Sequence, residues 1–283
     1  MLNFYIVIPA HNEQDSIGLT LDSLIGQSLR PKKLVVVNDN SSDNTASIVR
    51  EYYNKYDWIT LINNESSDAH IPGAKIISAF YKGYETLDEA YDVICKYDAD
   101  LIFPENYLET LAIQFNHHER LGMVAGHCYV KKGDAWELEG LTSKDHIRGA
   151  LKAYRKACFL EIGKLKPAMG WDTIDELLAK YFQWTFTTLD ELKVKHLKPT
   201  GANYNKDSNF LQGEALYKLR FGFLLTLLSS AKLAFRKKKF QFFIDYMKGY
   251  FRASKKKTPY LITEDQGRFV RNHRWKTMRK KFF

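Results

Sequence analysis

The first hundred residues alternate short apolar runs with stretches long enough for helices, and this alternation constrains the fold more than any other feature. Apolar runs rich in β-branched residues occur at 4-FYIVIP-9, 33-KLVVVN-38, 59-ITLIN-63 and 91-YDVICKY-97. The stretches between them place apolar residues at helical spacing. Strands and helices that alternate in this way form βαβ units. The sequence therefore predicts an α/β fold with a mostly parallel sheet and helices on both of its faces.

Polar side chains follow three of these predicted strands, in 10-AHNE-13, 38-NDNSSDN-44 and 98-DAD-100. Ligands of open α/β sheets bind outside the carboxyl ends of the strands, so we expect the site there. The loops contain neither G-x-G-x-x-G nor a P-loop motif, and a phosphate must be held by another device. Asp98 and Asp100 can approach one Mg²⁺ or Mn²⁺ ion that bridges phosphates, although Asp-x-Asp alone is a weak signal.

Three motifs in order resemble those of the family 2 glycosyltransferases, which have the GT-A fold. They are 7-VIPAHNE-13, 36-VVNDNSSDNT-45 and 98-DAD-100, and the resemblance covers about residues 3–201. It implies an inverting, metal-dependent enzyme that moves a sugar from a nucleotide diphosphate donor. UDP is the default nucleotide, and the implied acceptor is a glycan or a lipid-linked molecule of cell-surface polysaccharide synthesis.

The same resemblance implies roles for individual residues. The implied nucleotide-binding residues are Pro9, Ala10, Glu13, Asp39, Lys75 and Asp98. Lys75 is included because Phe80 and Tyr81 replace an Arg-Asn pair of the family pattern, which removes a cation. Asp98, Asp100 and His196 are the implied ligands of Mn²⁺ or Mg²⁺. Asn38 and Asn40 depart from the Asp and Gly that the family has in its second motif.

An inverting transferase needs a general base that takes the proton of the acceptor hydroxyl. The family takes it from an Asp at a helix start, upstream of a Gly-aromatic pair. In 170-GWDTIDELLAKYFQWT-185, counting back eleven residues from Gln183 gives Asp172. Asp175 is the alternative if the helix starts later, and Glu176 another. A structural interpretation also stands, in which the two aspartates only cap the helix.

Three further residues are candidates for contact with donor or acceptor. His146 and Arg148 lie in 145-DHIRGALKAYRKACFLEIGKL-165, which resembles a segment of bacterial surface-polysaccharide transferases, and Trp171 stands where the family often has Glu. The alternative for residues 145–165 is an amphipathic surface helix with a solvated Lys152.

The C-terminal third differs in composition from the rest. Lys and Arg outnumber Asp and Glu by 42 to 33, and basic tracts crowd this third. We expect a GT-A catalytic domain over residues 1–204 and a basic, aromatic-rich helical extension over 205–283. The apolar run 219–235 contains Arg220 and Lys232 and is too short to span a bilayer. It fits either an interfacial helix on an anionic membrane or a helix packed on the catalytic domain.

Two other functional classes fit the sequence less well. Basic and aromatic residues in 274-RWKTMRKKFF-283 fit non-specific contact with nucleic acid, but no recognised motif accompanies them, and we expect no nucleic-acid partner. A nucleotidyltransferase would usually carry a glycine-rich basic loop, and 9-PAHNEQDS-16 has no glycine, Arg or Lys.

Cysteine spacing and the N-terminus bear on the compartment. Cys95, Cys128 and Cys158 are scattered without the spacing of a disulfide framework or a zinc site. The first ten residues lack the charged and apolar regions of a signal peptide. We therefore expect a cytoplasmic protein, with peripheral contact on the inner face of the cytoplasmic membrane.

Overall fold

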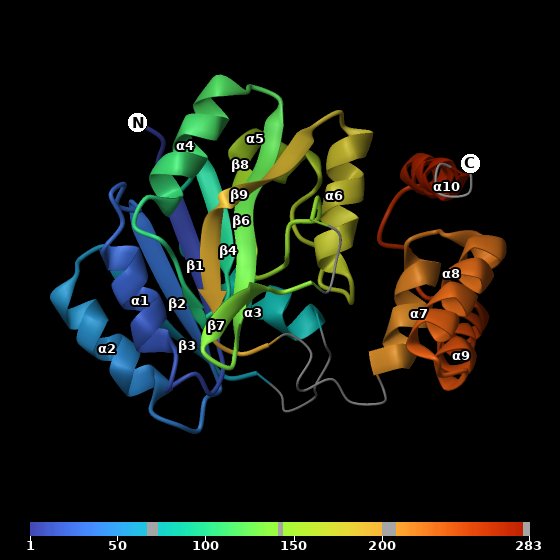
Figure 1. Cartoon of the computed structure of the whole chain (residues 1–283), viewed down its shortest axis with the longest axis horizontal. Helices are drawn as coiled ribbons and strands as arrows, with labels where there is room; N and C mark the ends of the chain where they lie inside the picture. The colour runs from blue at the N-terminus through green and yellow to red at the C-terminus, as the bar shows by residue number, and fades with distance from the viewer. Residues whose placement is uncertain (67–72, 141–143, 200–207, 280–283) are drawn as a thin grey trace.

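The computed structural model describes residues 1–66, 73–140, 144–199 and 208–279, and these contain a nine-stranded sheet (Figure 1). Its strands run in the order β3-β2-β1-β4-β8-β6-β9-β5, with β7 paired to β6. Their bounds are β1 Phe4–Ala10, β2 Lys33–Asp39, β3 Ile59–Asn64, β4 Val93–Tyr97, β5 Leu101–Ile102, β6 Leu121–Lys132, β7 Ala135–Leu138, β8 Leu151–Arg155 and β9 Thr185–His196.

The first four strands form the predicted parallel part of the sheet. β1 pairs in parallel with β2 and β4, and β2 pairs in parallel with β3. In this register Ala10 lies beside Asn38, and Asp39 lies beside Asn64. The polar loops that follow these strands therefore leave the sheet at one common edge, as the sequence pattern predicted.

The remaining strands add antiparallel pairings that bring distant residues to the same edge. β8 runs antiparallel to β4 and places Lys152 opposite Lys96. β9 lies parallel to β6 and antiparallel to the short β5, where His196 is the partner of Leu101. The end of β9 is thereby placed next to Asp100.

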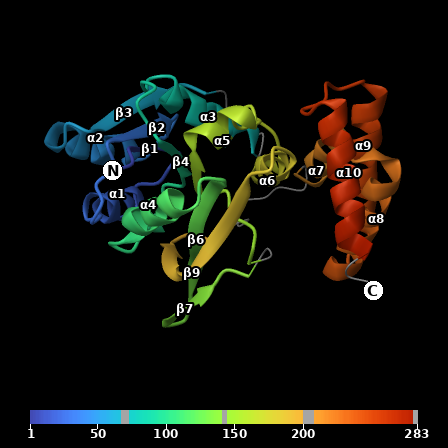
Figure 2. The ribbon, with the colours of Figure 1, turned by 90° about the horizontal axis from the view of Figure 1, so that it is seen from above.

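Helices cover both faces of the sheet: α1 and α4 lie on one face, and α3 and α5 on the other (Figure 2). The bounds of the first six helices are α1 Ile17–Ile25, α2 Thr45–Lys55, α3 Ala74–Tyr84, α4 Tyr107–His117, α5 Lys156–Glu161 and α6 Trp171–Tyr181. α3 packs closely, since a Cβ atom on Gly83 would lie 2.6 Å from the Val7 side chain. The predicted α/β architecture is thus confirmed.

The C-terminal helices form a group beside α6 (Figures 1 and 2). They are α7 Ser208–Lys218, α8 Gly222–Lys237, α9 Gln241–Lys255 and α10 Glu264–Arg279. Part of the group packs inward, because Phe221, Leu225 and Val270 belong to the same buried apolar cluster as the sheet. None of the described helices is long and apolar enough to cross a membrane. The domain boundary predicted at residue 204 lies outside the described residues.

Candidate active site

The loops after β1 and β2 are tied together by hydrogen bonds. Nδ1 of His11 lies 2.6 Å from the carbonyl oxygen of Asp39, and the amide of Glu13 donates to Oγ1 of Thr45 at 2.7 Å. Asn40 adopts a left-handed backbone conformation with φ of 56°. Asn and Gly tolerate this conformation better than other residues, so Asn40 suits this turn at a position where the related motif has Gly.

Asp39 is buried at the end of β2 and lies close to two polar side chains, one of which is the predicted Lys75. Its Oδ1 atom accepts a hydrogen bond from the Asn64 side chain at 2.6 Å, and Nζ of Lys75 lies 4.0 Å from its Oδ2 atom. The structure thus brings Lys75, at the start of α3, to Asp39. Neighbouring Asn38 has a buried Oδ1 atom with no hydrogen-bond partner among the described residues.

Glu13 lies in the loop between β1 and α1, after the buried Pro9 and Ala10 at the end of β1. Its carboxylate accepts hydrogen bonds from Lys198 at 2.7 Å and from Ser16 at 2.5 Å. Burial raises the pKa of Glu13, and the charge of Asp100 adds to the rise against the two hydrogen bonds. Glu13 therefore stands within electrostatic reach of the Asp-x-Asp pair.

The backbone of residues 98–100 is fixed by three separate segments. The Asp98 amide donates to the carbonyl of Ala150 at 3.1 Å, and the Leu197 amide donates to the carbonyl of Asp100 at 2.9 Å. Thr20 of α1 donates to the carbonyl of Ala99 at 2.8 Å. A loop held in this way presents its two carboxylates in a defined geometry.

His196 completes the set that the sequence predicted for a metal. Its Nε2 atom lies 3.4 Å from Oδ2 of Asp100, and ligand atoms of Asp98, Asp100 and His196 all lie within 4.8 Å of one another. Two carboxylates and an imidazole are ligands suited to Mn²⁺ or Mg²⁺. These residues therefore fit a divalent ion.

Glu139 orients this histidine, and sequence reasoning missed it because no motif surrounds it. Its Oε2 atom lies 2.9 Å from Nδ1 of His196 and 3.0 Å from Nη1 of Arg148. Burial disfavours the charged imidazole, but hydrogen bonds with Asp100 and Glu139 outweigh it and raise the pKa of His196 to about 9. Arg148, which the sequence analysis gives as a candidate contact of donor or acceptor, forms an ion pair with Glu139.

Cys128 and Glu139 form a second geometric set with His196. Burial raises the pKa of the Cys128 thiol, and sulfur is a soft ligand that Mg²⁺ and Mn²⁺ do not favour. Glu139 is also already paired with Arg148. We therefore assign no metal to this second set.

The predicted base lies at the start of α6, as the sequence pattern placed it. Gly170, with φ of 73°, allows the turn into this helix, and Asp172 lies in its first turn. The Asp172 side chain is 30% exposed, and its Oδ2 atom lies 3.4 Å from Nε2 of His146. Although burial opposes ionisation, His146 and Lys152 hold the pKa of Asp172 below its usual value.

Asp175, the alternative base, lies in a buried polar network. Its side chain is 2% exposed, accepts a hydrogen bond from the Tyr154 hydroxyl, and is 3.1 Å from Nζ of Lys152. Burial raises the pKa of Asp175 to about 7 despite the charge of Lys152. The same ammonium group lies 3.1 Å from Glu176 and donates to the carbonyl of Asp172 at 2.8 Å.

The surface-helix interpretation of residues 145–165 is wrong for Lys152. This residue lies on strand β8 and its side chain is fully buried. The segment around Lys152 forms a strand instead of a surface helix, and the buried charge is tolerated because Lys152 pairs with carboxylates of α6. His146 joins this network through Glu176, at 3.0 Å from its Nδ1 atom.

Lys96 connects the Asp-x-Asp pair with the start of α6. It forms an ion pair with Asp98, donates to the carbonyl of Gly149 at 3.1 Å, and lies 5.4 Å from the Trp171 ring centroid. Trp171 is buried. The contact between Lys96 and the Trp171 ring therefore links the Asp98 loop to the first turn of α6.

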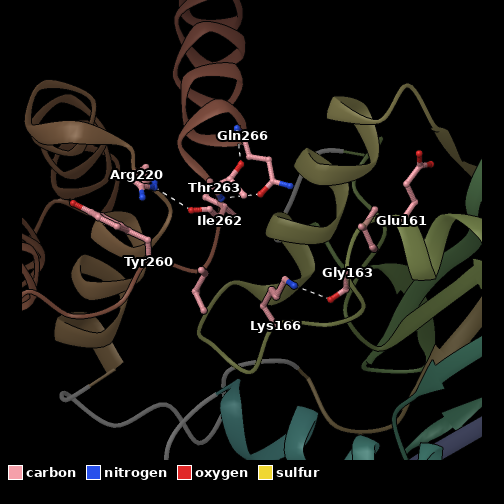
Figure 3. A pocket seen from close by; sticks show the side chains of 10 residues that line it. Glu161, Gly163, Lys166, Arg220, Tyr260, Ile262, Thr263 and Gln266 are labelled. Atoms are coloured by element: carbon pink, nitrogen blue, oxygen red, sulfur yellow. Dashed lines mark hydrogen bonds between the residues drawn. The ribbon is translucent and has the colours of Figure 1, made fainter.

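A cavity of about 480 Å³ lies away from these residues, between the α5–α6 connection and the start of α10 (Figure 3). Its cationic side chains are engaged with protein groups. Arg220 donates to the carbonyl of Ile262 at 3.0 Å and lies over the Tyr260 ring, and Lys166 donates to Gly163 at 2.7 Å. This cavity contains none of the predicted site residues.

Polar loops at one edge of a helix-flanked sheet, an Asp-x-Asp pair beside a histidine, and an aspartate at a nearby helix start are the features that the resemblance to GT-A glycosyltransferases implies. A family model described as "Glycosyl transferase family 2" matches residues 5–164, more than half of the chain. The chain belongs to this family.

Curated relatives match a part of the chain. The "Probable glycosyltransferase YdaM" of Bacillus subtilis is 36% identical over 123 residues, which are 43% of this chain and 28% of that protein. A Staphylococcus aureus "Poly-beta-1,6-N-acetyl-D-glucosamine synthase" is 26% identical over 121 residues, 43% of this chain and 27% of the synthase. The chain thus matches less than a third of the length of these relatives.

Solved structures support the fold. S. aureus TarS 1–349 in complex with UDP-GlcNAc is 16% identical with a TM-score of 0.57, covering 89% of this chain and 73% of that one. A mannosyltransferase from Pyrobaculum calidifontis, in complex with GDP-Man and Mn²⁺, is 12% identical with a TM-score of 0.55, covering 98% and 81%. The predicted GT-A fold is confirmed.

Proposed function

We propose that the protein transfers a sugar from a nucleotide diphosphate donor, with UDP the first nucleotide to test, and inverts the anomeric configuration. The observation that carries this proposal is the meeting of Asp98, Asp100 and His196 at the strand ends, within reach of the Glu13 and Asp39 loops. The UDP-GlcNAc bound to TarS supports the choice of UDP. The GDP-Man complex of the archaeal neighbour keeps GDP among the candidates.

In this proposal the nucleotide lies against Pro9, Ala10 and Glu13, with Asp39 and Lys75 beside its base or ribose. The buried Oδ1 atom of Asn38 offers a further acceptor there. Asp98, Asp100 and His196 hold Mn²⁺ or Mg²⁺, whose chemistry is to stabilise the charge of the departing diphosphate. Glu139 holds the His196 ring in place, as outer hydrogen-bond partners of metal ligands commonly do.

Asp172 is the proposed general base, and Asp175 positions it. Asp172 is the more exposed of the two, and its lowered pKa keeps it ionised at neutral pH. A carboxylate in that state accepts the proton of the acceptor hydroxyl as this oxygen attacks the anomeric carbon. His146 neutralises part of the charge of Asp172. The Trp171 ring lies against the Lys96 ammonium group beside this base.

We propose a glycan or lipid-linked acceptor, supported by the relative that is named as a polysaccharide synthase. We also propose peripheral contact of the helical extension with an anionic membrane. Large apolar side chains stay exposed along α8, α9 and the turn between them, namely Phe223, Leu224, Phe235, Phe240 and Phe251. Lysines 237–239 lie beside them in sequence, and basic side chains near a bilayer attract anionic lipids.

The test is isothermal titration of the protein with UDP, GDP and dTDP, each with and without Mn²⁺, in parallel with Asp100→Ala. Asp57→Ala is the matched control, since this exposed carboxylate lies just before β3, at the opposite edge of the sheet. The proposal predicts metal-dependent binding of one nucleotide, lost in Asp100→Ala and kept in Asp57→Ala. The proposal would be contradicted if none of the three proteins bound any nucleotide, or if the protein released pyrophosphate from a nucleoside triphosphate.

A further inference from the structure

Lys96 is a buried cation next to the Asp-x-Asp pair. It lies near the end of β4, and its side chain is 1% exposed. Its ammonium group contacts the Asp98 carboxylate, the carbonyl of Gly149 and the face of the Trp171 ring. Asp98 is the only charged group among these three contacts.

A buried ammonium group is stable only when it is paired with an opposite charge. Removing it from water costs several kcal/mol, which is about what the attraction in a well-formed ion pair returns. The carbonyl of Gly149 and the Trp171 ring are neutral partners that compensate only part of this cost. Asp98 is therefore the partner that compensates most of the burial of the Lys96 ammonium group.

Asp98 is also one of the three residues whose ligand atoms fit a divalent ion. An ion bound by Asp98 would draw the carboxylate away from Lys96 and would place a second cation next to the first. Like charges at such short range repel strongly in a buried environment. Lys96 and the divalent ion consequently compete for Asp98.

We propose that Lys96 is a resident counter-ion of the Asp-x-Asp pair, which weakens the binding of a divalent ion alone and makes that binding depend on a diphosphate. The negative charge of a nucleoside diphosphate offsets both cations, so that metal and nucleotide bind cooperatively. Lys96 is in this sense a positioning residue for Asp98. The inference rests on the proposed function, because it places a nucleoside diphosphate in the same site.

The experiment measures Mn²⁺ affinity by calorimetry, with and without UDP, for the unmodified protein, Lys96→Met and Lys96→Gln. Methionine keeps the apolar stem, and glutamine keeps a hydrogen-bond donor for Gly149, but neither is charged. Lys33→Met is the matched control, because it removes another lysine–aspartate pair, with Asp88 at 2.6 Å, at the opposite end of the strands.

Both neutral variants of Lys96 are expected to bind Mn²⁺ alone about tenfold tighter or more, the scale on which a contacting opposite charge shifts a carboxylate equilibrium. The gain that UDP gives to Mn²⁺ binding should shrink by the same factor. Lys33→Met should behave as the unmodified protein does.

Three outcomes overturn the inference in different ways. Unchanged Mn²⁺ affinity in both neutral variants removes the competition and leaves the proposed function intact. Tighter binding in Lys96→Met but not in Lys96→Gln would assign the effect to packing rather than to charge. Absence of Mn²⁺ binding in every protein, even with UDP, would remove the metal site and the inference together.

Discussion

Lys96 of β4 and Lys152 of β8 stand directly opposite each other in the antiparallel ladder, and both side chains are buried. Lys96 binds Asp98, and Lys152 binds Asp175 and the carbonyl of Asp172. Two neighbouring positions of one sheet thus hold the Asp-x-Asp loop and the start of α6. Because a hydrogen-bonded ladder is rigid, the sheet itself sets the separation between the proposed metal site and the proposed base.

Replacing each of the two candidate bases, Asp172 and Asp175, by asparagine separates their roles. Asp172→Asn is expected to lower kcat by at least about 100-fold, the usual contribution of a general base, while nucleotide affinity stays unchanged. Asp175→Asn is expected to lower the free energy of unfolding by about 2–4 kcal/mol instead, because it removes one of the two carboxylates that pair with buried Lys152. Turnover and urea unfolding check both. A stable Asp175→Asn protein without activity, beside an active Asp172→Asn protein, would reverse the assignment.

Lys152 is predicted to matter for stability far more than its neighbour Lys156. Lys152→Met leaves Asp175 and Glu176 without their shared cation inside the protein, and breaking a buried pair costs about 3–5 kcal/mol. Lys156→Met removes a pair with the exposed Glu89, worth about 0–1 kcal/mol, together with a hydrogen bond to the Glu89 carbonyl and a contact with the Tyr91 ring. Urea unfolding of both variants measures the difference. Equal loss in the two proteins would show that the buried network is not a stabilising unit.

The sequence predicted the parallel half of the fold well because strand periodicity and loop chemistry agree there. Each apolar run ends in polar residues, and the register of β1, β2 and β3 brings those residues together. Asp172, which the family resemblance placed at a helix start, lies in the first turn of α6. These features depend on residues close in sequence, which is why pattern reasoning reaches them.

Other parts of the site depend on pairings between distant strands and left no local signal. Glu139 and His196 are 57 residues apart along the chain. They meet because β7 pairs with β6 and β6 lies next to β9 in the sheet. Lys152 was read as solvated because a lysine is rarely buried without a partner, and its partners lie on α6. A sequence pattern cannot reveal such partners until the sheet order is known.

Stability should fall as pH rises through the range in which His146 loses its proton. Burial disfavours its charged form, but Asp172 and Glu176 outweigh this and raise the pKa of His146 from 6.5 to about 9. A raised folded pKa means that this stabilisation is complete below pH 6.5 and is lost as pH rises through 9. The loss is on the order of 3 kcal/mol for a shift of this size.

Urea unfolding of the unmodified protein and His146→Gln between pH 6 and pH 10, in a chelating buffer, isolates this term. His196 is retained in both proteins, so its own titration cancels in the comparison. The difference in unfolding free energy between the two proteins should narrow with rising pH. A constant difference would mean that His146 is not charged in the folded protein near neutral pH.

The exposed aromatic residues of α8 and of the turn before α9 provide the test of membrane contact. Phe235 is 89% exposed and Phe240 is 70% exposed, and the lysines 237–239 lie between them. Burial of two phenylalanines in the interfacial region would contribute several kcal/mol, so replacing both by serine should weaken vesicle binding about tenfold or more. Tyr53→Ser is the control, because Tyr53 is 51% exposed on α2.

Flotation with phosphatidylcholine vesicles, with and without phosphatidylglycerol, measures this binding. If the lysines act with the aromatic residues, binding requires the anionic lipid and weakens as salt is added, because salt screens the attraction. The double variant then loses binding, whereas Tyr53→Ser keeps it. Two results would leave the exposed phenylalanines without a role at a lipid surface. In one, the unmodified protein, the double variant and Tyr53→Ser float equally well with neutral and with anionic vesicles. In the other, none of the three floats with either kind of vesicle.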